Sequence, residues 1–272
     1  MLKVVLISQE EPFFIPKMVK SLLEDNAEYK IVAATVLKPH RKNKNMMHWL
    51  FERTKIYTYW ELGIAASGYV VTKVLSKVNP GGTNYSVRNL YEKEKVSVIE
   101  TNDINSAEYA EIIRKLDTDV IISISCPQIF KTELLQSVNK ECLNAHGTLL
   151  PRHRGVFGSW WTLFMEDKIA GSTIHTMEER LDAGNIVWQK SFTLQKSDTQ
   201  YSIAYATKRD MTSGLKEVLK AIGNNKLATI EPQYETTYNR APDKELGKKF
   251  HKNGHRVIKL KDLKYIFSSS YD

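Results

Sequence analysis

The sequence contains few cysteines. Among its 272 residues there are two, Cys126 and Cys142, which are too few for a disulfide framework or for a thiolate metal cluster. Both lie in apolar surroundings, so we interpret them as buried free thiols of a protein from a reducing compartment. This excludes the disulfide-stapled class of small secreted proteins.

Long hydrophobic runs are missing as well. The apolar start at residues 1–7 ends in a polar tetrapeptide and is too short for the core of a signal peptide. Residues 62–72 are uncharged, but these 11 positions fall short of the roughly 20 that a membrane-spanning helix requires. We therefore expect a cytoplasmic protein without a membrane partner.

Acidic residues are in the minority, because 39 Lys and Arg face 31 Asp and Glu and give a formal net charge of +8. The positive charge is concentrated in residues 38–44 and 244–264. Such a field attracts polyanions, including nucleic acid, nucleotide phosphates and polyglutamate tails. A solvated basic surface has the same composition, so charge alone names no partner.

The spacing of apolar residues predicts an α/β fold. Strands are expected over 2–7 and 31–37, with a helix between them that carries Pro16 in its first turn. A helix capped by Asn105 with Glu108 as its reciprocal partner should precede a buried strand over 119–125. A short helix near 131–138 then leads to a strand over 141–146. This alternation predicts a Rossmann-like, parallel-rich sheet flanked by helices.

The remaining segments are less uniform. Residues 38–95 hold a basic loop, an aromatic and small-residue segment over 57–78, and a break at 79–82. Further on, a helix is expected over 157–166 and strands over 170–177 and 185–193. Ser197 and Gln200 form a capping-box pattern at the start of a helix of about 22 residues. The last fifty residues should hold a short strand pair and a basic tail.

Three polar side chains carry the most information. Asn144 and His146 are two residues apart at the end of a predicted strand, so both project from one face. Ligands of open α/β sheets bind at the carboxyl ends of strands, where both residues should lie. Asp182, in the sequence Leu181-Asp182-Ala183-Gly184, can join them only from a separate loop.

An amide, an imidazole and a carboxylate together suit the transfer of a one-carbon acyl group to an amine. The reaction needs donors for a developing oxyanion and an acceptor for the amine proton. Each residue also has a structural interpretation. Asn144 and His146 can be a satisfied polar pair, and residues 181–184 can form a turn in which Asp bonds the backbone and Gly takes a positive φ.

The order and spacing of these motifs identify a family. The pattern Asn144-x-His146-x-x-Leu149-Leu150-Pro151-x-x-Arg154-Gly155, followed by Gly171–His175 and Leu181–Ile186, resembles the 10-formyltetrahydrofolate-dependent formyltransferases. The resemblance is dense over 96–195, looser over 1–37 and faint over 38–95. It implies the formyltransferase fold, a Rossmann-like sheet with an added β-hairpin region. It also implies that Asn144 and His146 bind the formyl oxygen, while Asp182 tunes His146 and assists proton removal.

The same resemblance implies 10-formyltetrahydrofolate as the cosubstrate and no metal. In this family the folate pocket is built largely from the backbone of two segments, which correspond here to Gln128, Ile129 and Phe130 and to the stretch from Glu178 to Asp182. We divide the chain into a formyltransferase catalytic domain over 1–195, with 38–95 as a variable insertion, and a C-terminal helix and basic extension over 196–272.

The branches of the family differ in the amine they formylate. The glycinamide-ribonucleotide branch typically has a glycine-rich phosphate loop after its first strand, where residues 8–12 here contain two acids and no glycine. The initiator-tRNA branch carries an additional barrel-like domain, for which the last fifty residues are too few, although the basic clusters leave RNA contact open. Deformylases usually carry a regulatory domain before the catalytic one, whereas the first strand here starts at Leu2.

We therefore expect the acceptor to be the amino group of a nucleotide-linked amino sugar, because residues 238–242 and 249–254 resemble the tails of small bacterial enzymes of that branch. Trp49, Tyr57, Tyr59 and Trp60 are candidates to stack a base, and a hydrophobic flap is the alternative. Methionyl-tRNA formyltransferase and a non-catalytic nucleotide- or RNA-binding module remain alternatives. We also expect a homodimer, as for many compact α/β enzymes.

Overall fold

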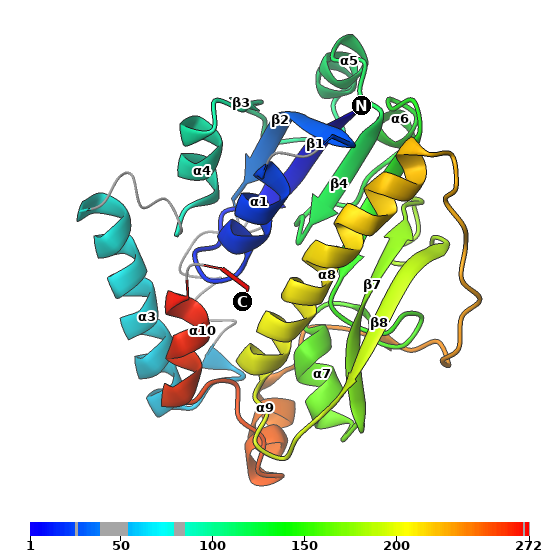
Figure 1. The fold of residues 1–272 in the computed structure, drawn as a ribbon. Coiled ribbons are helices and arrows are strands. Elements are labelled where there is room, and N and C mark those ends of the chain that lie inside the picture. Colours follow the sequence, from blue (N-terminus) through cyan, green and yellow to red (C-terminus); the bar gives the residue numbers. More distant parts are fainter. Residues whose placement is uncertain (25–26, 39–53, 79–84, 269, 272) are drawn as a thin grey trace.

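A seven-stranded sheet in the order β3-β2-β1-β4-β5-β7-β8 forms the centre of the protein (Figure 1). The computed structural model describes residues 1–24, 27–38, 54–78, 85–268 and 270–271. Five neighbouring strands run parallel: β1 (Leu2–Gln9), β2 (Tyr29–Leu37), β3 (Ser97–Val98), β4 (Val120–Ile124) and β5 (Glu141–His146). An antiparallel hairpin of β7 (Ile169–Thr176) and β8 (Ile186–Thr193) extends the sheet beyond β5. The predicted parallel-rich sheet with an added hairpin is confirmed.

Helices cover both faces of this sheet. Helices α1 (Ile15–Leu23) and α8 (Gln200–Gly223) pack on one face, and α5 (Ala107–Lys115) and α6 (Thr132–Leu135) pack on the other (Figure 1). Strand β1 illustrates why both faces need cover, since Val4 and Leu6 point into the first core while Val5 and Ile7 point into the second. A strand that is apolar on both sides is typical of the middle of a parallel sheet.

The first helix begins without a side-chain cap at its own N-cap residue, Phe14. Its free amide groups are satisfied from the preceding loop, where the Glu11 carboxylate accepts hydrogen bonds from the N–H groups of Phe13, Phe14 and Ile15 at 2.8, 2.9 and 3.0 Å. Pro16 needs no such partner because it has no N–H. A carboxylate of the chain itself therefore occupies the position at which a helix N-terminus binds an external anion.

Two predicted helix caps are wrong by one or two residues. Helix α5 is capped by Ser106, whose hydroxyl accepts a hydrogen bond from Tyr109 N–H, and not by Asn105. Helix α8 is capped by Thr199 and not by Ser197. Asn105 instead bonds to the backbone of Ile129 and Lys131, which ties the segment after β4 to the start of α5. Several Ser, Thr and Asn side chains precede each helix, and the tertiary contacts decided which of them caps.

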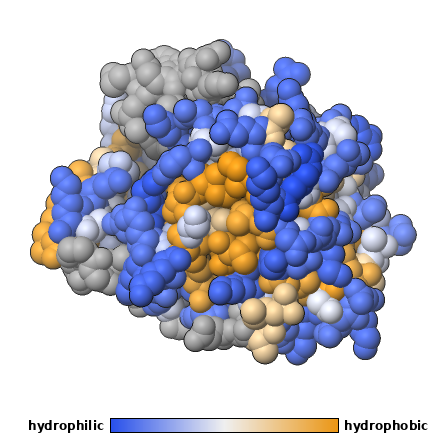
Figure 2. Space-filling view, turned by 90° about the horizontal axis from the view of Figure 1, so that it is seen from above, coloured by the Kyte–Doolittle hydropathy of each residue, from blue (hydrophilic) through white to orange (hydrophobic). Residues whose placement is uncertain are grey.

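Residues 57–78 are more regular than predicted, because most of them form the 20-residue helix α3 (Tyr59–Val78). The helix buries Glu61, Ile64, Gly68 and Thr72 and exposes most of its valines, so its apolar side does not face the core. This reversal hides the usual helical pattern in the sequence. In Figure 2 hydrophobic surface gathers near the middle of the view and along the left edge, the side on which α3 lies in Figure 1.

The proposed base-stacking aromatics have different environments. The ring of Tyr57 is buried, whereas Tyr59 and Trp60 are 96% and 70% exposed at the start of α3. Trp49 lies outside the described residues, as does the basic cluster apart from Lys38, which is exposed. Base stacking by these residues stays a prediction.

The described C-terminal region holds one short strand and three short helices rather than a strand pair with a tail. Its one strand, β9 (Tyr238–Asn239), pairs with β6 (Arg154–Gly155), which follows the LLP motif. After it come α9 (Lys244–Lys252), the short 3-10 helix η1 (Leu260–Asp262) and α10 (Leu263–Phe267). Helix α10 lies beside α3 (Figure 1). The remaining helices are α4 (Val87–Lys93) and α7 (Gly158–Phe164).

Helix α8 and the C-terminal segment pack on the same cores as the strands, and the division at residue 195 stays a prediction. Within the described parts of the chain, no helix is both long enough and apolar enough to cross a membrane.

The buried carboxylate of Glu61 joins α3 to the C-terminal region. It accepts hydrogen bonds from Thr58 N–H at 2.8 Å and from Val257 N–H at 2.8 Å, and it is 2% exposed. Glu61→Ala leaves both amides without a partner in the core, so we expect the free energy of unfolding to fall by about 2–4 kcal/mol, measured by urea denaturation.

The matched control is Glu111→Ala on α5, where the side chain is half exposed and pairs only with neighbours on its own helix at 3.5 and 3.6 Å. That change should cost less than about 0.5 kcal/mol. Equal losses in the two variants would contradict the role assigned to Glu61.

Candidate functional site

Two side chains from the end of one strand meet a carboxylate from a separate loop, at Oδ1 of Asp182. Asn144 Nδ2 lies 3.5 Å from it and His146 Nδ1 lies 3.7 Å from it. Asn144 and His146 come from the end of β5, with the buried Ala145 between them pointing to the opposite face. The structure thus brings together the three residues predicted from the sequence, and the His146 side chain, at 12% exposure, remains open to solvent.

The position of Asp182 is fixed by a second loop. Its Oδ2 accepts a hydrogen bond of 2.7 Å from the backbone N–H of Gly155, which follows the LLP motif. Asp182 itself has a positive φ of 51°, a conformation that Asp tolerates better than most residues. The bond to Gly155 leaves Oδ1 free to face Asn144 and His146.

The structural interpretation of residues 181–184 holds in part. Asp182 does bond backbone, that of the distant Gly155, but Gly184 does not have a positive φ. Gly184 is needed for space, because a Cβ atom on it would lie 1.7 Å from the carbonyl oxygen of Thr176.

The tautomer of His146 follows from its neighbours. Its Nε2 lies 3.2 Å from the carbonyl oxygen of His153, which can only accept, so Nε2 carries the hydrogen in neutral His146. This leaves the Nδ1 lone pair on the side of Asp182, where it can take a proton from a reacting amine.

The loop that supplies this carbonyl is held by a buried polar cluster. His153 is 4% exposed, and its Nε2 donates to Asp167 Oδ2 at 2.7 Å. Its Nδ1 accepts from Asn239 Nδ2 of β9 at 2.8 Å. The C-terminal strand thus helps to fix the loop that orients His146.

A third histidine, His175, belongs to the site but was not among the predicted catalytic residues. Strand β7 runs antiparallel to β5 and places His175 directly opposite Asn144. Its Nδ1 donates to the carbonyl of Thr176 at 2.8 Å, so its Nε2 accepts the 3.1 Å hydrogen bond from Asn144 Nδ2. The sequence analysis did single out the motif 171–175 that contains His175. It could not show that the antiparallel register of β7 with β5 places His175 opposite Asn144.

His175 is neutral at physiological pH. Burial, and secondly the nearby His146, lower its pKa from 6.5 to about 4. The unfolded chain takes up this proton near pH 6.5 and the folded protein only near pH 4, so the contribution of His175 to stability is present above pH 6.5 and is lost as the pH falls toward 4.

We therefore expect the melting temperature to drop more steeply between pH 6.5 and 4 in the wild type than in His175→Gln. Thermal unfolding followed by circular dichroism at several pH values measures this. Parallel pH profiles for the wild type and His175→Gln would contradict the assignment of a neutral, buried His175.

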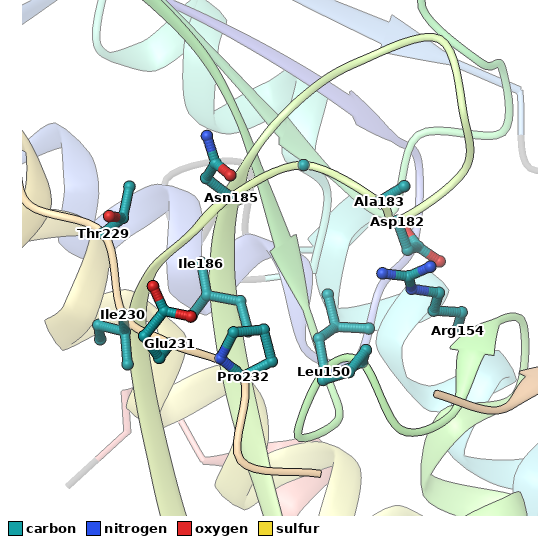
Figure 3. A pocket seen from close by; sticks show the side chains of 12 residues that line it. Leu150, Arg154, Asp182, Ala183, Asn185, Ile186, Thr229, Ile230, Glu231 and Pro232 are labelled. Atoms are coloured by element: carbon teal, nitrogen blue, oxygen red, sulfur yellow. The ribbon is translucent and has the colours of Figure 1, made fainter. Parts of the chain in front are cut away.

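A small pocket of about 160 Å³ adjoins the site on the Gly155 side (Figure 3). Asp182 and Arg154 lie together on one side of it, and the segment Thr229–Pro232 lies across from them. Arg154 Nε is buried and has no hydrogen-bond partner among the described residues. Asn144 and His146 do not line this pocket, so it meets the site only through Asp182.

The two segments predicted to bind folate lie next to each other. The N–H and hydroxyl groups of Thr132, just after residues 128–130, both bond to the Glu179 carboxylate. The Gln128 side chain is used internally, since it bonds to the backbone of Asn102 and Ile104.

Phe130 is fully buried, Ile129 is 51% exposed, and the Glu178 carboxylate bonds to Arg180. The side chains of Gln128 and Phe130 are thus already engaged within the protein. Folate binding by these positions stays a prediction.

The loop after β1 offers no phosphate site of the glycine-rich kind. Glu11 caps α1 as described, and the carboxylate of Glu10 accepts 3.2 Å hydrogen bonds from the N–H groups of Val87 and Arg88 at the start of α4. Both helix N-termini at this edge of the sheet are therefore already neutralised by the chain's own acids.

Comparison with known proteins agrees with this geometry. A family model described as "Formyl transferase" matches residues 63–219. Methionyl-tRNA formyltransferase of Borrelia garinii subsp. bavariensis is 33% identical over 150 residues, which cover 55% of this chain and 46% of that protein. The bifunctional polymyxin resistance protein ArnA of Wigglesworthia glossinidia brevipalpis is 27% identical over 190 residues, covering 65% of this chain and 28% of that protein.

This chain spans less than half the length of each of these two relatives. Among solved structures, an N-formyltransferase from Helicobacter canadensis, crystallised with folinic acid and dTDP-3-aminofucose, superposes with a TM-score of 0.58. It is 16% identical and the match covers 88% of this chain and 71% of that one, which shows a shared fold.

Proposed function

This chain belongs to the formyl transferase family, and on that premise we propose that it transfers a formyl group from 10-formyltetrahydrofolate to the amino group of a nucleotide-linked amino sugar. The observation that carries the reaction class is the convergence of Asn144 and His146 on Oδ1 of Asp182. An amide donor, an imidazole and an acid in one place are what a tetrahedral formyl intermediate requires.

We assign the following roles. The Asn144 amide donates to the formyl oxygen as it gains negative charge, and the His146 imidazole becomes a second donor once its Nδ1 is protonated. His146 Nδ1 takes the proton that the amine loses, and the carboxylate of Asp182 beside it stabilises the resulting imidazolium. His175 accepts one N–H of Asn144 and so directs the amide, while the other N–H turns from Asp182 to the formyl oxygen. The formyl carbon bonds to the amine while its bond to folate N10 breaks, N10 takes the proton held by His146, and the two products are the formamide and tetrahydrofolate.

The acceptor is inferred from the loop after β1, from a solved structure of the same fold and from the net charge. Glu10 and Glu11 fill the helix N-termini after β1, so an acceptor phosphate would not bind there in the manner of a glycine-rich phosphate loop. The Helicobacter canadensis protein, which has the same fold, was crystallised with a nucleotide-linked amino sugar. The net charge of +8 suits an anionic acceptor, whether a nucleotide-linked sugar or a tRNA.

Methionyl-tRNA is the second candidate acceptor. The observation that favours it is the 33% identity to a methionyl-tRNA formyltransferase over 55% of this chain. The described basic residues of α9, which include Lys248, Lys249 and Lys252, would supply phosphate contacts. A substrate screen separates the two.

The decisive experiment incubates the protein with 10-formyltetrahydrofolate and a panel of nucleotide-linked amino sugars with the amine at different ring positions, and separately with initiator Met-tRNA. Released tetrahydrofolate and the mass of the formylated product are measured. We expect transfer to an amino sugar and none to tRNA. Transfer to Met-tRNA alone would replace the proposed acceptor, and release of formate without any acceptor would indicate a hydrolase.

A further inference from the structure

The side chain of Lys208 on α8 is a cation that the reaction described above does not use. Its Nζ lies 3.2 Å from the hydroxyl oxygen of Ser125, and among the described residues no carboxylate forms an ion pair with it. Neighbouring cations are paired, because Lys190 and Arg209 both contact Asp210 Oδ1, at 3.2 and 3.1 Å. Lys208 is partly buried, and burial lowers the pKa of its ammonium group.

Lys208 meets the sheet close to the reacting groups. Ser125 directly follows β4, whose pairing with β5 aligns Ser123 with Asn144 and Ile124 with Ala145. Ser125 itself has a positive φ of 54°, so the strand ends before it. On the neighbouring strand a Cβ atom on Gly147, the residue after His146, would lie 3.4 Å from Oγ1 of Thr207, so the part of α8 that carries Lys208 packs against the residue next to His146.

Glu11 could neutralise Lys208 only by giving up hydrogen bonds at the start of α1. Glu11 is the one acid that raises the pKa of Lys208, partly offsetting burial, but both of its oxygens are already bonded to the N–H groups at the start of α1. A partly buried charge without a counterion has an unfavourable desolvation free energy, and a ligand of opposite charge offsets it.

We propose that Lys208 and Ser125 form a subsite for a phosphoryl group of the acceptor, which rests on the proposed function. The Lys208 ammonium donates to the Ser125 oxygen, so the Ser125 O–H hydrogen stays available for an anionic oxygen. The ammonium has two further hydrogens for the same anion. In this protein the subsite takes the place of a phosphate loop after β1, where Glu10 and Glu11 occupy the helix N-termini.

The test is Lys208→Met, which keeps the length of the side chain and removes the charge, so folding is preserved. We expect the KM for the nucleotide-linked amino sugar to rise about 10- to 100-fold, with little change in the KM for 10-formyltetrahydrofolate. Inorganic pyrophosphate should inhibit the wild type and inhibit Lys208→Met at least about tenfold more weakly. The control is Lys216→Met on the same helix, where the lysine is exposed and pairs with Glu24 at 3.1 Å.

The outcomes separate the subsite from the function. If the wild type formylates an amino-sugar nucleotide and Lys208→Met retains its KM for it, the subsite is wrong while the function stands. If Lys208→Met raises the KM for folate instead, the subsite belongs to the donor and the proposal fails. If no amino-sugar nucleotide is formylated, direct binding of inorganic pyrophosphate, measured by calorimetric titration, decides alone, and an affinity unchanged in Lys208→Met overturns the subsite.

Discussion

Replacing His146 with alanine is expected to lower kcat for formyl transfer by about 10³-fold while leaving the affinity for folate nearly unchanged. The imidazole is lost both as a donor to the formyl oxygen and as the acceptor of the amine proton, whereas the predicted folate segments at 128–130 and 178–182 lie on other loops. Tetrahydrofolate release in steady state measures kcat, and calorimetric titration with tetrahydrofolate measures binding.

The control for this variant is His255→Ala. That histidine packs against Phe250 in the C-terminal region, away from β5, and its removal should leave kcat close to that of the wild type. Turnover that persists in His146→Ala would remove His146 from the mechanism. Loss of folate binding together with turnover would show that the variant had disturbed the fold rather than the chemistry.

Gly184→Ala should be nearly as damaging although glycine carries no reactive group. The added methyl would lie 1.7 Å from the carbonyl oxygen of Thr176, where no contact is tolerated, so the loop must move. Asp182 is two residues away, and a shift of about 1 Å in a catalytic group costs roughly 100-fold in rate. We therefore expect kcat/KM to fall at least about 100-fold and the free energy of unfolding to fall by about 1–3 kcal/mol.

Gly63→Ala provides the matched change on α3, because a Cβ at Gly63 meets nothing within 4 Å. This variant should be as active as the wild type and slightly more stable, by about 0.5–1 kcal/mol, since alanine is the better helix former. An active Gly184→Ala would mean that the loop adapts without moving Asp182, and the steric argument would then be wrong.

Much of the architecture could be predicted from the sequence. The strands with apolar residues on both faces and the helix with Pro16 in its first turn were recognisable, because local patterns encode them directly. Caps were misassigned by one or two positions, since several adjacent polar residues compete for the same amides. Helix α3 was missed because it turns Glu61 and Thr72 inward and its valines outward, which removes the usual separation of polar and apolar faces.

The candidate site shows the same division. Asn144, His146 and Asp182 were predicted from their motifs, and residue order alone marked them as parts of one site. Their distances, the alignment of His175 with Asn144 and the contact of Lys208 with Ser125 were not predictable, because each depends on which elements become neighbours.

The sequence by itself thus determined the order of strands and helices and the chemical groups available, because these depend on nearby residues. Only the tertiary structure decided that Asp182 is anchored by Gly155, that Glu11 caps α1, and that Gly184 is required for space rather than for its backbone angles. These facts arise from contacts between segments distant in the chain, and the compact packing of the whole molecule fixes such contacts.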